Sequence, residues 1–376
     1  MSGRGQVIVE GVCVRQVKLP LVTPYKVSLM TMEWFDPFIV EVSGSDGAGG
    51  FGEALIVPGY TAETVEGSWN LCNRLSQQIV GLSLDDAVAV VGRDIREGVG
   101  VVSALLAAID MIKRAPALDA SERFSVPLLA PLNSHCLQEI APEIEKRLQE
   151  GFRTLKVKVG FDWEDDLRRV RHIQACTQGR ATLRLDANQG YGIEDGRAFA
   201  SALNPAGIEL FEQPCHMDDW GANTAVAAVS AVPVMLDESI YGVSDISRAA
   251  EIDGVGFVKL KLKKIGSVQM LTQALREIRA CGLRPVLGDG VSVEIGCWME
   301  ACVARSTIDN AGEMNGFLKT SARLFETPLD FKDGSIQVPA AFRPRLAPKV
   351  LERHTMRRMD YGVGTAFRVA DTEQRA

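Results

Sequence analysis

Five short apolar segments in the middle of the chain each end in a charged residue. These end residues lie 24 to 28 residues apart and are Lys158, Asp186, Glu212, Asp237 and Lys261. A step of that length accommodates one strand, one helix and two loops, so the pattern predicts repeated βα units. Parallel strands joined by crossover helices have their C-terminal ends on one face of a sheet or barrel. The repeat therefore predicts two lysines and three carboxylates at one mouth.

The same rhythm continues to Asp289 and Glu313, and it defines the fold that we expect. If the strand ending at Lys158 is the second, the strand ending at Glu313 is the eighth. We therefore predict an α/β protein with a (β/α)8-type, modified TIM barrel over residues 126–330.

The first part of the chain has a different pattern. Apolar and polar residues alternate over residues 7–43, and a turn leads to residues 51–54, which predicts a small antiparallel meander. A helical period with a buried helix at 101–111 follows. We predict an N-terminal α+β capping domain over residues 1–125. The C-terminal segment, residues 331–376, contains a further strand-like run and is predicted to return to the cap and complete it.

Composition excludes several classes of function. The chain has 376 residues and a formal net charge of -7, which argues against nucleic acid or an anionic membrane as a partner. No apolar run reaches the roughly 18 residues of a membrane span, and the first residues lack an apolar secretory core, so we expect a cytoplasmic protein. The eight cysteines form no C-x-x-C pair, which predicts reduced thiols. We also expect a homo-oligomer.

The three carboxylates suit a metal ion. Asp186, Glu212 and Asp237 end consecutive strands, and hard oxygen ligands without nearby His or Cys favour Mg²⁺. The alternative is that each acid caps a helix or pairs with a base at the barrel rim. Because neighbouring strand residues point to opposite faces, we assign Asp237 to the metal and place Glu238 behind it. Lys259 points deeper into the barrel, and it is expected to pair with Asp237 or Glu238.

The lysines suit proton transfer. Lys156 and Lys158 share one strand face, and two nearby ammonium groups disfavour each other's charge, so Lys158 is a candidate base. Lys261 ends the sixth strand, which faces the second across an eight-stranded barrel. A substrate α-carbon between them would meet one lysine on each side. The alternative is that the lysines of residues 259–264 form a solvated, charged edge.

These motifs resemble the enolase superfamily, in particular the muconate-lactonizing-enzyme-like subgroup of its mandelate racemase/muconate lactonizing enzyme family. The motifs that carry the resemblance are the Lys-x-Lys ending at Lys158, Asp186 with Asn188, Glu212 in Glu-Gln-Pro, Asp237 in Asp-Glu-Ser, and Lys261 five residues before Gly266. The resemblance covers nearly the whole chain. It implies a capping domain, a modified barrel, Mg²⁺, and removal of a proton α to a carboxylate to give a metal-stabilised enediolate.

The resemblance also indicates where a small carboxylic acid substrate would bind. Residues 52–64 resemble the mobile cap loop of the family, and Glu313 stands where the family often has an acid that faces the substrate. Substrate contacts are expected from the cap, from beside the metal and from the last two strands, namely Tyr25, Tyr60, Asn188, Asp289, Glu313 and Asn315.

Several overall reactions can begin with removal of the proton α to a carboxylate. Two opposed bases favour a racemase or epimerase of an amino-acid derivative, a proline-like acid or a betaine. The alternatives are a dehydratase of hydroxyproline or a sugar acid, a muconate-type cycloisomerase, and a metal-binding structural or sensing barrel without activity. Residues 288–290 lack the histidine base of mandelate racemase. The Glu-Met-Asn-Gly run at 313–316 lacks the Asp-x-Asp of dipeptide epimerases and is nearer to the cycloisomerase pattern.

Overall fold

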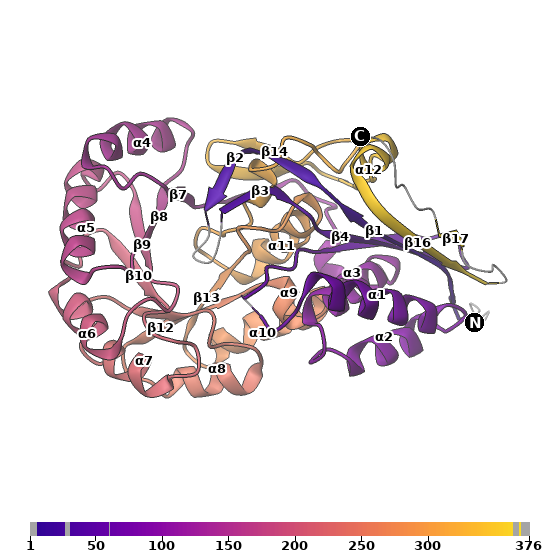
Figure 1. Ribbon diagram of the computed structural model, residues 1–376, viewed down its shortest axis with the longest axis horizontal. Coiled ribbons are helices and arrows are strands. Elements are labelled where there is room, and N and C mark those ends of the chain that lie inside the picture. Colours follow the sequence, from indigo (N-terminus) through magenta and orange to yellow (C-terminus); the bar gives the residue numbers. More distant parts are fainter. Residues whose placement is uncertain (1–5, 27–30, 60, 364–367, 370–376) are drawn as a thin grey trace.

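The computed structural model describes residues 6–26, 31–59, 61–363 and 368–369. Figure 1 shows a curved parallel sheet with helices on its outer side at the left, and a second region with its own sheet and helices at the right. The predicted combination of a modified TIM barrel and a capping domain is confirmed.

The barrel sheet follows the chain order. In the described ranges, seven parallel strands lie side by side, each hydrogen-bonded to the next in sequence. They are β7 (Ala130–Leu132), β8 (Thr154–Lys158), β9 (Thr182–Asp186), β10 (Ile208–Glu212), β11 (Val234–Leu236), β12 (Val255–Leu260) and β13 (Arg284–Leu287). Their inner and outer faces are both covered, which explains why the strands are almost continuously apolar.

The eighth segment closes the barrel without forming a regular strand. Gly312 forms a parallel bridge with Leu128, and the Glu313 N–H donates to the Leu287 carbonyl at 3.0 Å on the other side. The chain then turns at Asn315 into the 3-10 helix η2 (Gly316–Leu318). The predicted eighth strand is therefore reduced to the few hydrogen bonds that this short segment can make.

Helices cover the outside of the barrel, and each packs an apolar face against the sheet. They are α4 (Leu137–Gln149), α5 (Trp163–Thr177), α6 (Ile193–Ala202), α7 (Trp220–Ala227), α8 (Val243–Ala250), α10 (Val268–Ala280) and α11 (Glu294–Thr307). A one-turn helix, α9 (Leu262–Ile265), lies between β12 and α10. Buried side chains from these helices and from the strands form one continuous core.

The cap is a sheet packed on helices. Its order is β17 (Arg368–Val369), β16 (Thr355–Gly362), β1 (Val9–Val17), β4 (Phe38–Gly44) and β5 (Gly49–Ala54). A separate hairpin pairs β2 (Leu19–Lys26) with β3 (Thr31–Phe35). The cap helices are α1 (Val65–Ile79), α2 (Leu84–Arg93) and α3 (Val99–Ile112).

The central cap helix α3 is the buried helix expected from residues 101–111. It approaches β5 so closely that a Cβ atom at Gly52 would lie 2.0 Å from the Ala104 carbonyl oxygen, and one at Gly50 equally close to that of Ala108. Glycine at both positions is required by this approach.

The C-terminal segment 331–376 divides between the two regions. The hairpin of β14 (Asp330–Lys332) and β15 (Ser335–Val338) pairs with β6 (Phe124–Pro127). It lies at the N-terminal end of the barrel, where the Leu128 N–H donates to the Gly334 carbonyl at 2.8 Å. The 3-10 helix η1 (Pro116–Leu118) lies earlier in the chain, near the cap–barrel junction. In the C-terminal segment, the last helix is α12 (Pro348–His354). Beyond α12, β16 pairs with β1 of the cap. The tail thus completes the cap through β16, whereas the hairpin belongs to the barrel.

A buried glutamate of the cap joins it to the barrel. Glu53 on β5 accepts hydrogen bonds from the N–H groups of Val293 at 2.6 Å and Ile295 at 3.1 Å, at the start of α11. It thereby satisfies helix N–H groups that have no partner within the helix. The cap is fixed over the C-terminal ends of the barrel strands.

Two expectations from composition can be compared with this fold. Within the described part of the chain, no helix is both long enough and apolar enough to cross a membrane. All eight cysteines lie in that part, and each is a free thiol.

Candidate active site

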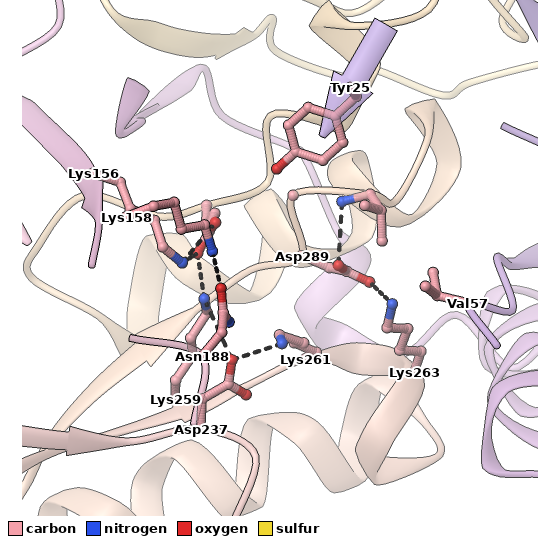
Figure 2. Close-up of a pocket in the computed structure, with 13 residues that line it drawn as sticks. Tyr25, Val57, Lys156, Lys158, Asn188, Asp237, Lys259, Lys261, Lys263 and Asp289 are labelled. Atoms are coloured by element: carbon pink, nitrogen blue, oxygen red, sulfur yellow. Dashed lines mark hydrogen bonds and ion pairs between the residues drawn. The ribbon is translucent and has the colours of Figure 1, made fainter. Parts of the chain in front are cut away.

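A pocket opens where the barrel strands end beneath the cap. Figure 2 shows lysine and acid side chains from different strands converging in it, with Tyr25 of the cap above and Val57 at the right, beside Lys263. The residues that line it are Tyr25, Val57, Lys156, Lys158, Asn188, Asp237, Lys259, Lys261, Lys263, Asp289, Gly290, Val291 and Glu313. Both lysines predicted as bases therefore lie in one pocket.

Each of the three predicted metal ligands is buried and in contact with ammonium groups. Asp186 lies 2.8 Å from Lys156 and 2.5 Å from Lys158. Glu212 lies 3.0 Å from Lys156 and 3.0 Å from Lys259. These contacts keep charged acids stable where water does not reach them.

Asp237 follows β11 and has several partners. It lies 2.7 Å from Lys261, 3.2 Å from Lys264 and 3.6 Å from Lys259. Burial alone would raise its pKa, but the positive charges of Lys261 and Lys264 outweigh burial and hold the pKa well below the ordinary value.

The other two carboxylates respond differently to burial. For Asp186, Lys156 and Lys158 outweigh the effect of burial and lower the pKa. For Glu212, burial and the negative charge of Asp186 outweigh its two lysine partners and raise the pKa. The same physical effects therefore act in opposite net directions on neighbouring strands.

Lys156 is fixed as a cation. Burial would lower its pKa, but the carboxylates of Asp186, Glu212 and Glu313 raise it well above the ordinary value. Any repulsion from the neighbouring Lys158 ammonium is outweighed at Lys156, because three acids surround its ammonium group. It is suited to holding charge and not to accepting a proton.

Lys158 and Asn188 form a network at the edge of the pocket. Lys158 donates to the Asn188 side-chain oxygen, and Asn188 donates its own N–H to Asp186 at 3.0 Å. The Asn188 amide also donates to Glu238 at 3.0 Å. Arg169 of α5 donates to the Lys158 carbonyl oxygen. Lys158, a third of whose side chain is exposed, is thus oriented at both its backbone and its ammonium group.

A divalent cation fits the chemistry of these donors. Asp186, Glu212 and Asp237 supply carboxylate oxygens from adjacent strands, and the second oxygen of buried Glu238 has no hydrogen-bond partner among the described residues. Across the described ranges, however, no three acid, cysteine or histidine side chains are already gathered closely enough to hold an ion. The ammonium groups separate the acids, so a metal would compete with lysines for the same oxygens.

The acids of the last two strands are paired within the protein. Asp289 forms an ion pair with Lys263 at 2.6 Å, and the charges of Lys263 and Lys261 outweigh burial and lower its pKa. Glu313 lies 3.0 Å from Lys156 and also contacts Lys259. Both line the pocket as predicted, but their oxygens already have charged partners.

The remaining predicted contacts differ in position. Tyr25 lies above the pocket, where the Lys319 ammonium stands 3.9 Å from the centre of its ring. Burial would raise the Tyr25 pKa, but Lys319 and the pocket lysines outweigh it and lower that pKa. Asn315 does not line the pocket; it donates to the Leu129 carbonyl at 3.1 Å and accepts from Lys319 at 3.0 Å. Tyr60 lies outside the described residues.

Three residues important to this geometry were not assigned a role from the sequence. Gln213, after Glu212, accepts from the N–H groups of Asp237 at 3.0 Å and Ser239 at 3.2 Å, and so holds the next strand end. Glu300, a buried acid in the middle of the mostly apolar helix α11, accepts from the N–H groups at residues 262 and 289. Lys264 bonds the Asp237 carbonyl at 2.7 Å, and burial lowers the Lys264 pKa to about 8. The sequence offers a signal for two of these residues: Glu300 is an acid within an apolar run, and Lys264 belongs to the lysine cluster at 259–264.

Comparison with known proteins identifies the family. Residues 139–344 match the model described as enolase C-terminal domain-like, and residues 9–120 match the mandelate racemase/muconate lactonizing enzyme N-terminal domain. The chain belongs to the enolase superfamily, in its mandelate racemase/muconate lactonizing enzyme family. The predicted resemblance is therefore confirmed.

The similarity to known relatives extends over most of this chain. The L-Ala-D/L-Glu epimerase of Bacillus subtilis is 27% identical over 310 residues, covering 77% of this chain and 83% of the relative. The crystal structure of muconate lactonizing enzyme from Pseudomonas fluorescens with muconolactone superposes with a TM-score of 0.83, at 24% identity over 93% of this chain and 99% of the other. The dipeptide epimerase of Enterococcus faecalis, with Mg and L-Leu-L-Tyr, gives a TM-score of 0.80 at 23% identity over 89% and 98%. At these identities the two structures establish the fold.

Proposed function

We propose that this enolase-superfamily protein is a Mg²⁺-dependent racemase or epimerase. It would act on the carbon α to the carboxylate of an amino-acid derivative, a proline-like acid or a betaine. The observation that carries the proposal is the placement of Lys158 and Lys261 in one pocket on β8 and on the residue after β12, with β9, β10 and β11 between them. The epimerase relatives support the same class of reaction.

The metal would be held by Asp186, Glu212 and Asp237. When bound, it would supply positive charge to a substrate carboxylate and so make the α-proton more acidic. The Mg present in the structure of the Enterococcus faecalis relative supports this choice of ion.

The two lysines would share the proton transfer. One removes the α-proton from one face of the carbon, and the ammonium of the other returns a proton to the opposite face. Lys156 holds Asp186 and Glu212, and Asn188 orients Lys158. The cap residues Tyr25 and Val57 cover the pocket and limit access of water.

The test is a screen of single enantiomers of carboxylic acids in D₂O, with and without Mg²⁺. Metal-dependent deuterium at the α-carbon together with the opposite epimer, detected by mass spectrometry and chiral chromatography, supports the proposal. Loss of water from the substrate would instead identify a dehydratase, and a lactone formed from a muconate-like diacid would identify a cycloisomerase. Deuterium incorporation in none of the acids, at any metal concentration, would contradict the shared half-reaction.

A further inference from the structure

Four buried charges form a closed ring at the floor of the pocket. One Glu212 oxygen lies 3.0 Å from Lys156 and the other lies 3.0 Å from Lys259. Both oxygens of Glu313 lie 3.0 Å from the Lys156 ammonium, and Glu313 also contacts Lys259. Each cation in this ring touches both anions, and each anion touches both cations.

The ring is a side-chain layer of the barrel. Lys156, Glu212 and Lys259 come from the second, fourth and sixth strands, and Glu313 comes from the eighth segment. Alternate strands of a (β/α)8 barrel contribute four side chains to one layer, and bulky apolar residues dominate such layers. Here the layer instead alternates positive and negative charge. An apolar cluster that includes Leu210, two residues before Glu212, lies on neighbouring inward positions.

Because its side chains are buried, the ring depends on the balance between its positive and negative charges. The exposed fractions of the side chains are 5% for Lys156, 1% for Glu212, 2% for Lys259 and 10% for Glu313. A charge at such depth needs a partner, because water does not compensate for one that is removed. Two lysines and two glutamates give a net charge of zero.

We propose that Glu313 shares the ammonium groups of Lys156 and Lys259 with Glu212, and that it thereby weakens their hold on the Glu212 oxygens that a metal ion would need. Glu313 is then a positioning residue of the metal site. The inference rests on the proposed metal site. Without Glu313, the two ammonium groups have Glu212 as their shared remaining partner in the ring, and they compete with a divalent cation for it.

The test is a double-mutant cycle on metal affinity, measured without substrate. Mn²⁺ binding to the wild type, Glu313→Gln, Lys259→Met and the double variant is followed by electron paramagnetic resonance of free Mn²⁺. We expect Glu313→Gln to weaken Mn²⁺ binding roughly 10-fold to 100-fold, the range seen when partners of metal ligands are removed. In the Lys259→Met background, the same change is expected to weaken binding less than about threefold, because one competing cation is gone.

A buried ion pair in the same strands provides the matched control. Arg184 on β9 and Glu209 on β10 lie 2.8 Å apart, and Arg184 also donates to the Ala311 carbonyl at 2.8 Å. The Arg184→Met/Glu209→Gln variant is expected to lose stability but to bind Mn²⁺ within about threefold of the wild type, because charge is removed away from the ring.

The outcomes separate the explanations. Wild-type affinity in Glu313→Gln would overturn the inference while leaving the metal site intact, and equal losses in both backgrounds would show that Glu313 acts independently of Lys259. If Glu313→Gln does not fold, Lys259→Met and the double variant decide: similar Mn²⁺ affinities support the inference, and a large loss in the double variant contradicts it. A wild type that binds no Mn²⁺ would contradict the proposed metal site itself.

Discussion

Asp237 has three charged partners beside the pocket. Its carboxylate contacts Lys259, Lys261 and Lys264. We expect Asp237→Asn to lower activity by about 10³-fold or more, since the proposed metal ligand and the partner of Lys261, a proposed base, are lost together. Removing one partner of a buried ion pair also costs about 3–5 kcal/mol of stability. Steady-state kinetics and urea unfolding measure the two effects.

The control for this change is Asp309→Asn, which alters an exposed acid that lies near Arg279 and Arg284. It should leave both activity and stability nearly unchanged, because exposed ion pairs contribute about 0–1 kcal/mol. Full activity of Asp237→Asn in the presence of chelator would rule out the metal role.

The two lysines at the sides of the pocket distinguish the possible reactions. If the enzyme epimerises, Lys158→Ala should still exchange the α-proton of one enantiomer with D₂O, and Lys261→Ala that of the other. Interconversion should be lost in both variants, because each direction requires both groups. Deuterium exchange of each enantiomer, followed by mass spectrometry, gives the answer. One indispensable lysine together with a dehydrated product would favour a dehydratase.

At the residue scale, the sequence predicts positions better than partners. Lys158, Asp186 and Glu212 are the last residues of their strands, as the spacing indicates. Lys259 was expected to pair with Asp237 or Glu238, and it contacts Asp237 at 3.6 Å, but its nearer partners are Glu212 and Glu313. The two-residue period of a strand predicts the face on which each side chain lies. It does not predict the layer of the barrel in which side chains from different strands meet.

Helix α11 shows how an element outside the pocket holds the loops inside it. Glu300 accepts from the Leu262 N–H at 2.9 Å and from the Asp289 N–H at 3.1 Å, just after β12 and β13. Both loops carry pocket residues, Lys263 and Asp289. A single buried side chain therefore fixes the relative position of two strand ends.

Replacing Glu300 by alanine or glutamine tests its role as a hydrogen-bond acceptor. Glu300→Ala leaves two buried N–H groups without partners, and we expect a loss of about 2–5 kcal/mol in the free energy of unfolding. Glu300→Gln keeps one acceptor oxygen and should lose less. Urea unfolding of both variants tests this order, and an alanine variant as stable as the glutamine variant would contradict the role of the acceptor.

Element types follow from the sequence more readily than element ends. The βα repeat and the buried cap helix are present as predicted because both depend on local periodicity. The eighth strand is reduced to a bridge at Gly312, and the hairpin β14–β15 lies against β6. Both depend on contacts between segments more than 180 residues apart in the chain, which no local pattern encodes.

At the scale of the whole molecule, the cap and barrel are joined through buried carboxyl groups. Glu53 of the cap reaches the start of α11. Burial raises the pKa of Glu53 from 4.5 to about 8, despite hydrogen bonds from the backbone that favour the charged form. The folded protein therefore binds a proton at Glu53 more tightly than the unfolded chain does.

This difference makes the attachment of the cap sensitive to alkaline pH. For an acid with a raised pKa, the stabilising contribution is complete below the unfolded value of 4.5 and is lost as pH rises through about 8. Glu53→Gln keeps the side-chain shape without an ionisable group. Its stability relative to the wild type should therefore increase between about pH 5 and pH 9, by up to roughly 4–5 kcal/mol at about 1.4 kcal/mol per pKa unit.

Urea unfolding of both proteins at saturating Mg²⁺, across this pH range, measures the difference directly. Both proteins retain Glu300, whose pKa burial also raises to about 8 and whose negative charge contributes to the raised pKa of Glu53. The control is Glu66→Gln, which changes an acid with an exposed side chain in the first turn of α1. A difference for Glu53→Gln that does not change with pH would mean that Glu53 is charged in the folded protein, held by the backbone N–H groups at the start of α11. The cap would then be joined to the barrel by a charged helix cap that alkaline pH leaves intact.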